Sequence, residues 1–343
     1  MITTYSLYKE LAKYGFTSDS TKNSLESLMH QASILKHNES FQDLFPNRDN
    51  YNDLALDMLN FVKMTQKHFT VRSGHQERWE ITPSQWMLDN YESNIQHLEI
   101  LGFISQVKPS NLNNNAICIL GSTSKTMQIR MDYTQSFIED TSTDKIIMLS
   151  GERYVNPKID GLEEELKEIA DAFKLYDWKK LTETHLIENI YNKSNFFGKF
   201  QAYIIDTPAG NLPRPTTQTT VIELVNWLKT HDEIKNIVFV SNQPYIRYQE
   251  AIISQVLHYL DYKLDFEVVG SRYIGENAQS AIGSLGSYIF ATTPKILMDI
   301  NQKIDSPQVI ELFKEIYESQ PLVYSDLVSH LVSNITISII GEV

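Results

Sequence analysis

The chain has 343 residues, of which 42% are hydrophobic and 21% are charged, a composition typical of a folded globular protein. At roughly 150 residues per domain, this length predicts two domains. The formal net charge is −13, and residues 1–112 contain 10 Lys/Arg against 13 Asp/Glu, so neither the whole chain nor its first part is basic. Proteins that bind nucleic acid usually present a basic face to the phosphate backbone, so the charge balance argues against a nucleic-acid partner.

Residues 1–112 are predicted to form an all-α domain, because their apolar residues recur at helical spacings, as over residues 25–32. A further helix is expected to begin at Thr82-Pro83, with the proline in its first turn. The Leu-Gly-Phe sequence at 101–103 resembles the end of a winged-helix module, which makes DNA an alternative partner that the acidic balance disfavours.

The polar run 108–115 is rich in Asn, Pro and Ser, and we place the domain boundary there, either as a hinge or as a plain connecting loop. Residues 116–343 are predicted to form an α/β domain, because continuous apolar strands alternate with helices. This pattern indicates a doubly wound, mostly parallel, Rossmann-like sheet covered on both faces. The strands are expected at 117–120, 146–149, 203–205, 237–240, 266–269 and 335–340. The helices are expected at 127–137, 162–173, 221–228, 252–260 and 309–316.

Location in the cell is indicated by three features of the sequence. The single cysteine, Cys118, cannot form an intramolecular disulfide, which agrees with a reducing compartment. Because Cys118 lies within an apolar run, it is more often expected to be a core residue than a nucleophile. The first residues lack the charged start and the continuous apolar stretch of a signal peptide, and no window approaches the roughly 18 apolar residues that span a bilayer. We therefore expect a soluble, cytoplasmic protein.

Three of the predicted strands end abruptly in polar residues, and the carboxyl ends of parallel strands meet at one edge of a sheet. One shared ligand site is therefore expected at that edge. Glycine after the first strand permits close approach of the backbone, although the loop is neither a Walker A sequence nor the three-glycine dinucleotide fingerprint. The residues expected to bind the ligand are Gly121, Ser122, Thr123, Arg130, Gly151, Arg153, Thr216, Thr217, Thr219, Ser241, Asn242, Gln243, Tyr245 and Arg247.

The threonine-rich segment 216–220 begins a predicted helix, and Thr216 or Thr217 can cap it. Free backbone N–H groups and hydroxyls at this helix start would suit an anion, with Arg214 adding positive charge. A capped helix without a ligand is the alternative interpretation.

Charged residues near the strand ends are the candidates for chemistry. Arg130, Arg153 and Arg247 are expected to neutralise an anionic ligand, and Glu152 or Asp206 to act as general base. The alternatives are a structural salt bridge for the adjacent Glu152 and Arg153, and solvent exposure for Arg130 and Arg247. No metal site is expected, because the nine histidines form no close helical pair and the acidic cluster 163–168 fits a solvated helix start. The sequence contains no motif that identifies a cofactor.

The order of these motifs resembles the YdcF/SanA/ElyC-like superfamily of Rossmann-like proteins, over about residues 116–260. The shared features are a glycine after the first strand, an arginine on the next helix, a Ser-Gly strand end, a threonine-rich helix start and a Val-Ser strand end, here Gly121, Arg130, Ser150-Gly151, Thr216–Thr220 and Val240-Ser241. The chain departs from the family in having Val221-Ile222 for a common Glu-Asn, and Gln243-Pro244-Tyr245 where the family has a histidine. The resemblance implies a pocket for a nucleotide-like small molecule.

Two hypotheses for the function follow. In the first, the protein binds, and acts on, a small anionic or nucleotide-like ligand at the carboxyl edge of its parallel sheet. In the second, it is a non-catalytic ligand sensor or interaction module that binds a protein partner through its helical domain. The missing family histidine and the lack of a recognisable nucleophile favour the second hypothesis, and the convergence of polar strand ends favours the first.

Overall fold

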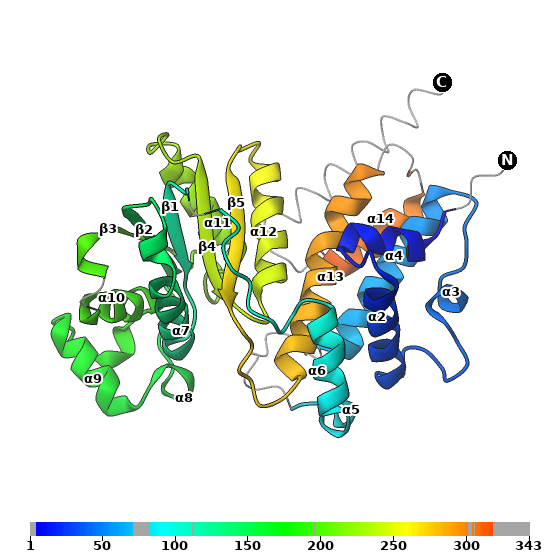
Figure 1. Ribbon diagram of the computed structural model, residues 1–343, viewed down its shortest axis with the longest axis horizontal. Coiled ribbons are helices and arrows are strands. Elements are labelled where there is room, and N and C mark those ends of the chain that lie inside the picture. The colour runs from blue at the N-terminus through cyan, green and yellow to red at the C-terminus, as the bar shows by residue number, and fades with distance from the viewer. Residues whose placement is uncertain are drawn as a thin grey trace. The chain divides into compact units, whose positions relative to one another are not determined.

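The computed structural model describes residues 5–70, 82–111, 113–194, 197–300, 304 and 306–317 (Figure 1). The chain divides into two compact units, one formed by Met1–Ile104 with Ile274–Val343 and the other by Ser105–Tyr273. The expected last strand, 335–340, lies outside the described residues. No helix in the described ranges is both long and apolar enough to cross a membrane.

The helical unit is built from both ends of the chain. Its elements are α1 (Leu7–Glu10), the 3-10 helix η1 (Leu11–Tyr14), α2 (Asp19–Gln31), α3 (Phe41–Leu44), α4 (Tyr51–Thr65), the π-helix η2 (Gln66–Thr70), α5 (Gln85–Asp89), α6 (Tyr91–Ile100), α13 (Gln279–Asp299) and α14 (Pro307–Tyr317). The single helix expected after Thr82-Pro83 is present as two helices, α5 and α6, and Pro83 lies before the α5 N-cap, Ser84, rather than in the first turn. The helix expected at 309–316 is α14.

Helix α13 joins the two parts of this unit. Its Leu285 and Ile289 are fully buried, and α13 packs on α4. The Tyr288 hydroxyl donates a hydrogen bond to the carbonyl oxygen of Tyr14 at 3.0 Å, and the hydroxyls of Tyr14 and Thr293 share another at 2.7 Å. The structure therefore differs from the expected division at residue 112, because the residues after 273 complete the helical unit rather than the α/β domain. An apolar stripe predicts that a helix will be buried, but not which part of the chain will bury it.

The α/β unit contains a five-stranded sheet. Its strands are β1 (Ala116–Leu120), β2 (Lys145–Gly151), β3 (Gln201–Thr207), β4 (Asn236–Asn242) and β5 (Asp265–Ser271). Its helices are α7 (Ser124–Gln135), η4 (Ile138–Asp140), α8 (Pro157–Asp160), α9 (Glu163–Ala172), η5 (Trp178–Lys180), α10 (Glu183–Lys193), η6 (Phe197–Lys199), α11 (Thr217–Leu228) and α12 (Ile246–Tyr259). Five strands and four helices of this unit lie where the sequence predicts them, whereas α10 was not predicted.

All the strands of the sheet are parallel, in the order β3-β2-β1-β4-β5. Helices α7 and α10 pack on one face, and α11 and α12 pack on the other (Figure 1). Strand β1 is buried along its whole length, as an apolar run covered on both sides requires. This is the predicted doubly wound α/β fold, and it brings the carboxyl ends of β2, β1 and β4 together at one edge.

The two chain segments that enter and leave the α/β unit lie side by side. Val107 and Gly270 exchange two backbone hydrogen bonds, each 3.0 Å long, in an antiparallel bridge. Gly270 also packs against the backbone of Ser241, so closely that a Cβ would stand 2.6 Å from the Ser241 carbonyl carbon. The bridge ties the segment before β1 to the last strand of the sheet.

Candidate functional site

The strand order locates the part of the sheet edge that is best suited to a ligand. In a doubly wound sheet, ligands bind where the order of strands reverses, because the loops after the two central strands diverge to opposite faces. In this sheet the reversal lies between β1 and β4. The chain turns from β1 into α7 through Gly121, and from β4 into α12 after Asn242.

Arg130 of α7 connects the two strands at this point. Its Nε donates a hydrogen bond to Asn242 Oδ1 at 3.0 Å, and its Nη1 donates to the carbonyl oxygens of Leu120 and Gly121 at 2.6 and 2.8 Å. The side chain is 1% exposed, and none of its hydrogen bonds is with a carboxylate. Within the described residues, Nη2 donates to no acceptor. Burial lowers the pKa of Arg130 to about 10, against the opposing effects of Glu183 and Tyr245, so the guanidinium remains charged at neutral pH.

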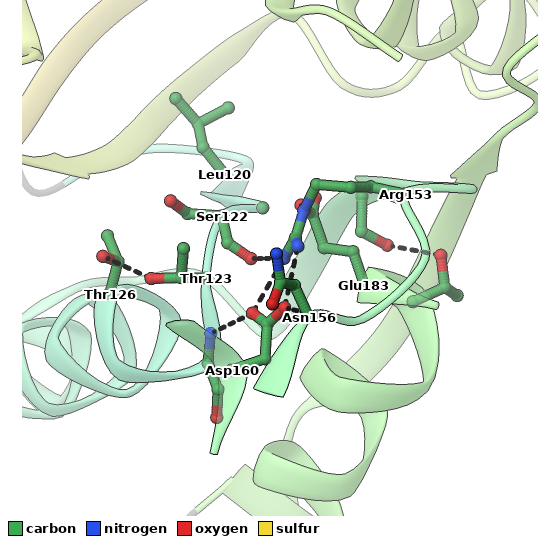
Figure 2. Close-up of polar contacts among 12 residues, drawn as sticks. Leu120, Ser122, Thr123, Thr126, Arg153, Asn156, Asp160 and Glu183 are labelled. Carbon is green, nitrogen blue, oxygen red and sulfur yellow. Dashed lines mark hydrogen bonds and ion pairs between the residues drawn. The ribbon is translucent and has the colours of Figure 1, made fainter. Parts of the chain in front are cut away.

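Glu183, the first residue of α10, lies at the same edge (Figure 2). Its side chain is 12% exposed, and Oε2 accepts a hydrogen bond from Arg153 Nε at 3.0 Å. Its other oxygen, Oε1, lies against Gly121, where a Cβ would collide with it and would also stand 2.8 Å from the Leu149 carbonyl oxygen. Glycine is therefore required at 121 for the carboxylate to approach the end of β1.

The ionisation of Glu183 is set by two opposing effects. Burial raises the pKa of this carboxyl, while Arg153, Arg130 and Arg214 act to lower it. The net direction is upward, so Glu183 holds its proton to a higher pH than an exposed glutamate does. Within the described residues, Oε1 accepts no hydrogen bond, so this oxygen can accept a hydrogen bond or a proton from a ligand.

Arg153 holds this carboxylate in place (Figure 2). It forms two hydrogen bonds with Asp160, at 2.8 and 3.0 Å, and its Nη2 also donates to the Ser122 carbonyl oxygen at 3.0 Å. Burial would lower the pKa of Arg153, but the hydrogen bonds and charges of Asp160 and Glu183 outweigh burial and raise it. Arg153 was expected to neutralise a ligand, whereas its guanidinium is already paired with two carboxylates. Its role in the structure is to position Glu183 and the loop after β1.

Asp160 binds the start of α7 as well as Arg153. Its Oδ1 accepts a hydrogen bond from the Ser124 backbone N–H at 3.2 Å, and its Oδ2 accepts one from the Asn156 N–H at 2.9 Å. The side chain is fully buried. A buried carboxylate of the protein therefore takes the position at the α7 N-terminus where a phosphate binds in many sheets of this kind.

The threonine-rich segment caps α11 over the ends of β2 and β3. The Thr216 N–H donates to Thr219 Oγ1 at 2.9 Å, and the Thr219 N–H donates to Thr216 Oγ1 at 3.3 Å, which forms a reciprocal cap. Pro215 lies against Gly151, where a Cβ would stand 2.6 Å from the proline Cγ. The hydroxyls of Thr216 and Thr219, both predicted ligand donors, are thus engaged in the cap.

The predicted residues after β4 have structural partners as well. The buried Ser241 hydroxyl donates a hydrogen bond to Gln249 Oε1, and Gln243 Nε2 donates to the Ser105 carbonyl oxygen at 2.9 Å. Tyr245, at the start of α12, lies near enough to Arg130 to influence its pKa. Burial raises the pKa of Glu250, and the positive charge of Arg247 acts to lower it.

Arg130, Arg153 and Arg214, which all act on Glu183, form the arginine cluster. Within the described residues, neither of the two predicted general bases is hydrogen-bonded to an arginine of this cluster. Asp206 is exposed on β3 and accepts a hydrogen bond from the Thr184 hydroxyl at 2.6 Å. Glu152 is exposed and accepts one from the Ala209 N–H at 3.1 Å. Thr123, a predicted ligand donor, shares a hydrogen bond with the Thr126 hydroxyl at 3.0 Å. Of the carboxylates considered, Glu183 is the one placed for chemistry at the sheet edge.

Sequence reasoning missed Glu183 and Asp160. The signal for Glu183 is its position: it falls on the stripe formed by Leu186, Ile187 and Ile190, the buried residues of α10. An acidic residue on an apolar stripe requires a buried partner, which Arg153 supplies. Asp160 gives no comparable signal, because it belongs to the four-residue helix α8.

Three arginines act on Glu183 at this edge, namely Arg153, Arg130 and Arg214. Arg153 is paired with Glu183 and Asp160, whereas the hydrogen bonds of Arg130 are all with neutral acceptors. A buried cation without a hydrogen-bonded carboxylate attracts an anion. Across the described part of the chain, no group of three or more His, Cys, Asp or Glu side chains is arranged to hold a metal ion.

No protein-family model matches the chain, and no curated protein matches its sequence.

Proposed function

We propose that the α/β unit binds a small anionic ligand at the carboxyl edge of its sheet, between β1 and β4. The observation that carries the proposal is Arg130, a buried cation whose hydrogen bonds are all with neutral acceptors and whose Nη2 is not used by the described residues. A buried charge is costly unless an opposite charge approaches it. Glu183 acts on Arg130 through space without a hydrogen bond, and a ligand oxyanion at Nη2 would supply an opposite charge in direct contact.

Glu183 complements Arg130 at the other side of Gly121. Its Oε1 accepts a hydrogen bond from a ligand hydroxyl when ionised, and its raised pKa suits it to exchange a proton with the ligand. A donor and an acceptor on either side of one glycine fit a ligand that carries both an oxyanion and a hydroxyl. The motif order that resembles the YdcF/SanA/ElyC-like superfamily supports a nucleotide-like ligand of this kind.

The test is a screen of the full chain by thermal shift, followed by calorimetric titration of each hit. The panel contains nucleotides, S-adenosylmethionine and sugar phosphates, all at one ionic strength, because a ligand that binds the folded state raises its apparent stability. Arg130→Lys keeps a positive charge but removes the guanidinium, and with it the Nη2 donor as well as the fork that spans Asn242 and the end of β1. A charge-assisted hydrogen bond contributes about 1.5–3 kcal/mol, so this variant should weaken binding roughly 10- to 150-fold.

Lys229→Gln is the matched control, because it removes an exposed positive charge at the far end of α11. It should bind the ligand as the unmodified protein does. The proposal is wrong if no anion in the panel raises the melting temperature, or if Arg130→Lys binds the ligand with unchanged affinity while remaining folded.

A further inference from the structure

The first turn of α11 presents hydrogen-bond donors that the protein does not use. Thr217 and Gln218 are the first two residues of the helix, so their N–H groups have no intrahelical acceptor. The cap formed by Thr216 and Thr219 satisfies the N–H groups of those two residues, and the Thr220 N–H donates to the Thr216 carbonyl oxygen. In the described structure, the N–H groups of Thr217 and Gln218 meet no acceptor.

Two buried polar side chains at the same end of the helix also lack partners. Thr207 is 1% exposed and Gln218 is 5% exposed, and neither Thr207 Oγ1 nor Gln218 Oε1 makes a hydrogen bond with the described residues. Unsatisfied polar atoms are rare in the interior of a protein and each costs stability. The presence of two such atoms at one end of α11 indicates that a group of a ligand forms the missing hydrogen bonds.

The alternation of side chains along β3 places Thr207 under α11. Tyr203 and Thr207 are four residues apart and therefore point to the same face of the sheet. The Tyr203 ring packs against Trp227 of α11, with ring centroids 4.9 Å apart, so this is the α11 face. Gln218 lies on the buried stripe of α11 with Val221 and Val225, and helical side chains tilt toward the helix N-terminus. Both unsatisfied oxygens therefore lie at the opening of α11.

We infer that the first turn of α11 and the end of β3 form a subsite for the phosphoryl group of a phosphate monoester. The Thr217 and Gln218 N–H groups donate to phosphoryl oxygens, the Thr207 hydroxyl donates to a third, and Gln218 Oε1 accepts from a hydroxyl of the ligand. The helix dipole favours a negative charge at this position. The corresponding position on α7 is not open to a phosphate, because Asp160 already binds the Ser124 N–H there.

This inference rests on the proposed function and specifies its ligand. Strands β1 and β3 are separated by β2, so their ends are about 10 Å apart at two strand spacings. Arg214, directly before the capping segment, acts on Glu183 and so links the subsite to the arginine cluster. A nucleoside monophosphate or a sugar phosphate is long enough to place its phosphoryl group at α11 and a hydroxyl at Glu183.

The test uses inorganic phosphate as the probe, titrated calorimetrically into the full chain at constant ionic strength. Thr217→Pro removes both the N–H and the hydroxyl, and proline fits the first position of a helix. Thr216 has φ −114° and ψ 167°, an extended conformation that the residue before a proline adopts readily. This variant should lower phosphate affinity tenfold or more. Thr217→Val, which keeps the N–H, should lower it less.

Thr207→Val separates a ligand role from a structural one. Removing an unsatisfied buried hydroxyl should leave the melting temperature unchanged or higher, while phosphate binding weakens at least about threefold. The subsite is refuted if phosphate does not bind the unmodified protein, or if it binds Thr217→Pro with unchanged affinity. A water molecule that forms the missing hydrogen bonds of Thr207 Oγ1 and Gln218 Oε1 would give that result. If Arg130→Lys weakens a panel ligand while Thr217→Pro does not, the subsite fails and the proposed function stands. If no anion binds at all, both fail.

Discussion

Replacing Asp160 by asparagine tests the ion-pair cluster at the sheet edge. Asp160 accepts four hydrogen bonds, two from Arg153 and one each from the N–H groups of Ser124 and Asn156. The amide removes the negative charge and turns one acceptor oxygen into a donor that faces other donors. Breaking a buried ion pair on one side costs about 3–5 kcal/mol. Because Arg153 keeps its hydrogen bond to Glu183, we expect the lower end, about 3 kcal/mol.

The assay is differential scanning calorimetry of the full chain, supported by urea denaturation. At about 2–4 °C per kcal/mol for a domain of this size, the melting temperature of the α/β unit should fall by roughly 6–12 °C. Glu164→Gln is the control, because Glu164 is an exposed acid of α9 and its substitution should change stability by less than about 0.5 kcal/mol. A loss below about 1 kcal/mol for Asp160→Asn would refute the assignment of Asp160 as the residue that holds Arg153 and the start of α7.

Two further predictions concern single side chains. Folding raises the pKa of Glu183 above its value in the unfolded chain, which is about 4.3. The stability that this carboxyl contributes should therefore be lost as the pH rises from about 4.3 through the pKa of Glu183 in the folded protein. Glu183→Gln has no carboxyl at this position and should not show this loss. The stability of Glu183→Gln relative to the unmodified protein should therefore increase between pH 4.5 and pH 8 in urea denaturation, and a difference that is constant or decreases would contradict this. Burial raises the pKa of the Cys118 thiol, so Cys118 should not react with a thiol reagent such as iodoacetamide in the folded protein. It should react fully in denaturant. Rapid labelling of the native protein would contradict this prediction and would show that β1 opens.

The sheet could be predicted from the sequence because its signals are local. Each strand is an apolar run that ends in polar residues, as Ile117–Leu120 ends at Gly121, and a parallel sheet necessarily gathers these ends at one edge. Arg130 could be placed on the helix after Gly121, but the sequence left open whether its side chain reached the edge or was solvated. Its contact with Asn242 joins residues 112 positions apart, and the sequence gives no sign of it.

What could not be predicted depends on contacts between distant segments. The hydroxyls of Thr216 and Ser241 suit a ligand by residue type, but one completes a helix cap and the other binds Gln249. Glu183 is largely buried, whereas Glu152 and Asp206 are exposed. This difference follows from how the elements pack and cannot be predicted from the residue type. The assignment of α13 to the helical unit likewise depends on Tyr14, which lies at the opposite end of the chain.

The bridge between Val107 and Gly270 closes a unit that is inserted in the middle of the chain, and this position sets the order in which the two units are completed during synthesis. The α/β unit is an insertion whose two ends are joined there, so every residue of its sheet has been translated once the ribosome has passed Tyr273. The helical unit at that moment still lacks α13, which supplies the hydroxyls that bond to Tyr14. The inserted unit is therefore complete before the helical unit, and we expect it to fold first, in contrast to the usual N-terminal-first order of multidomain chains.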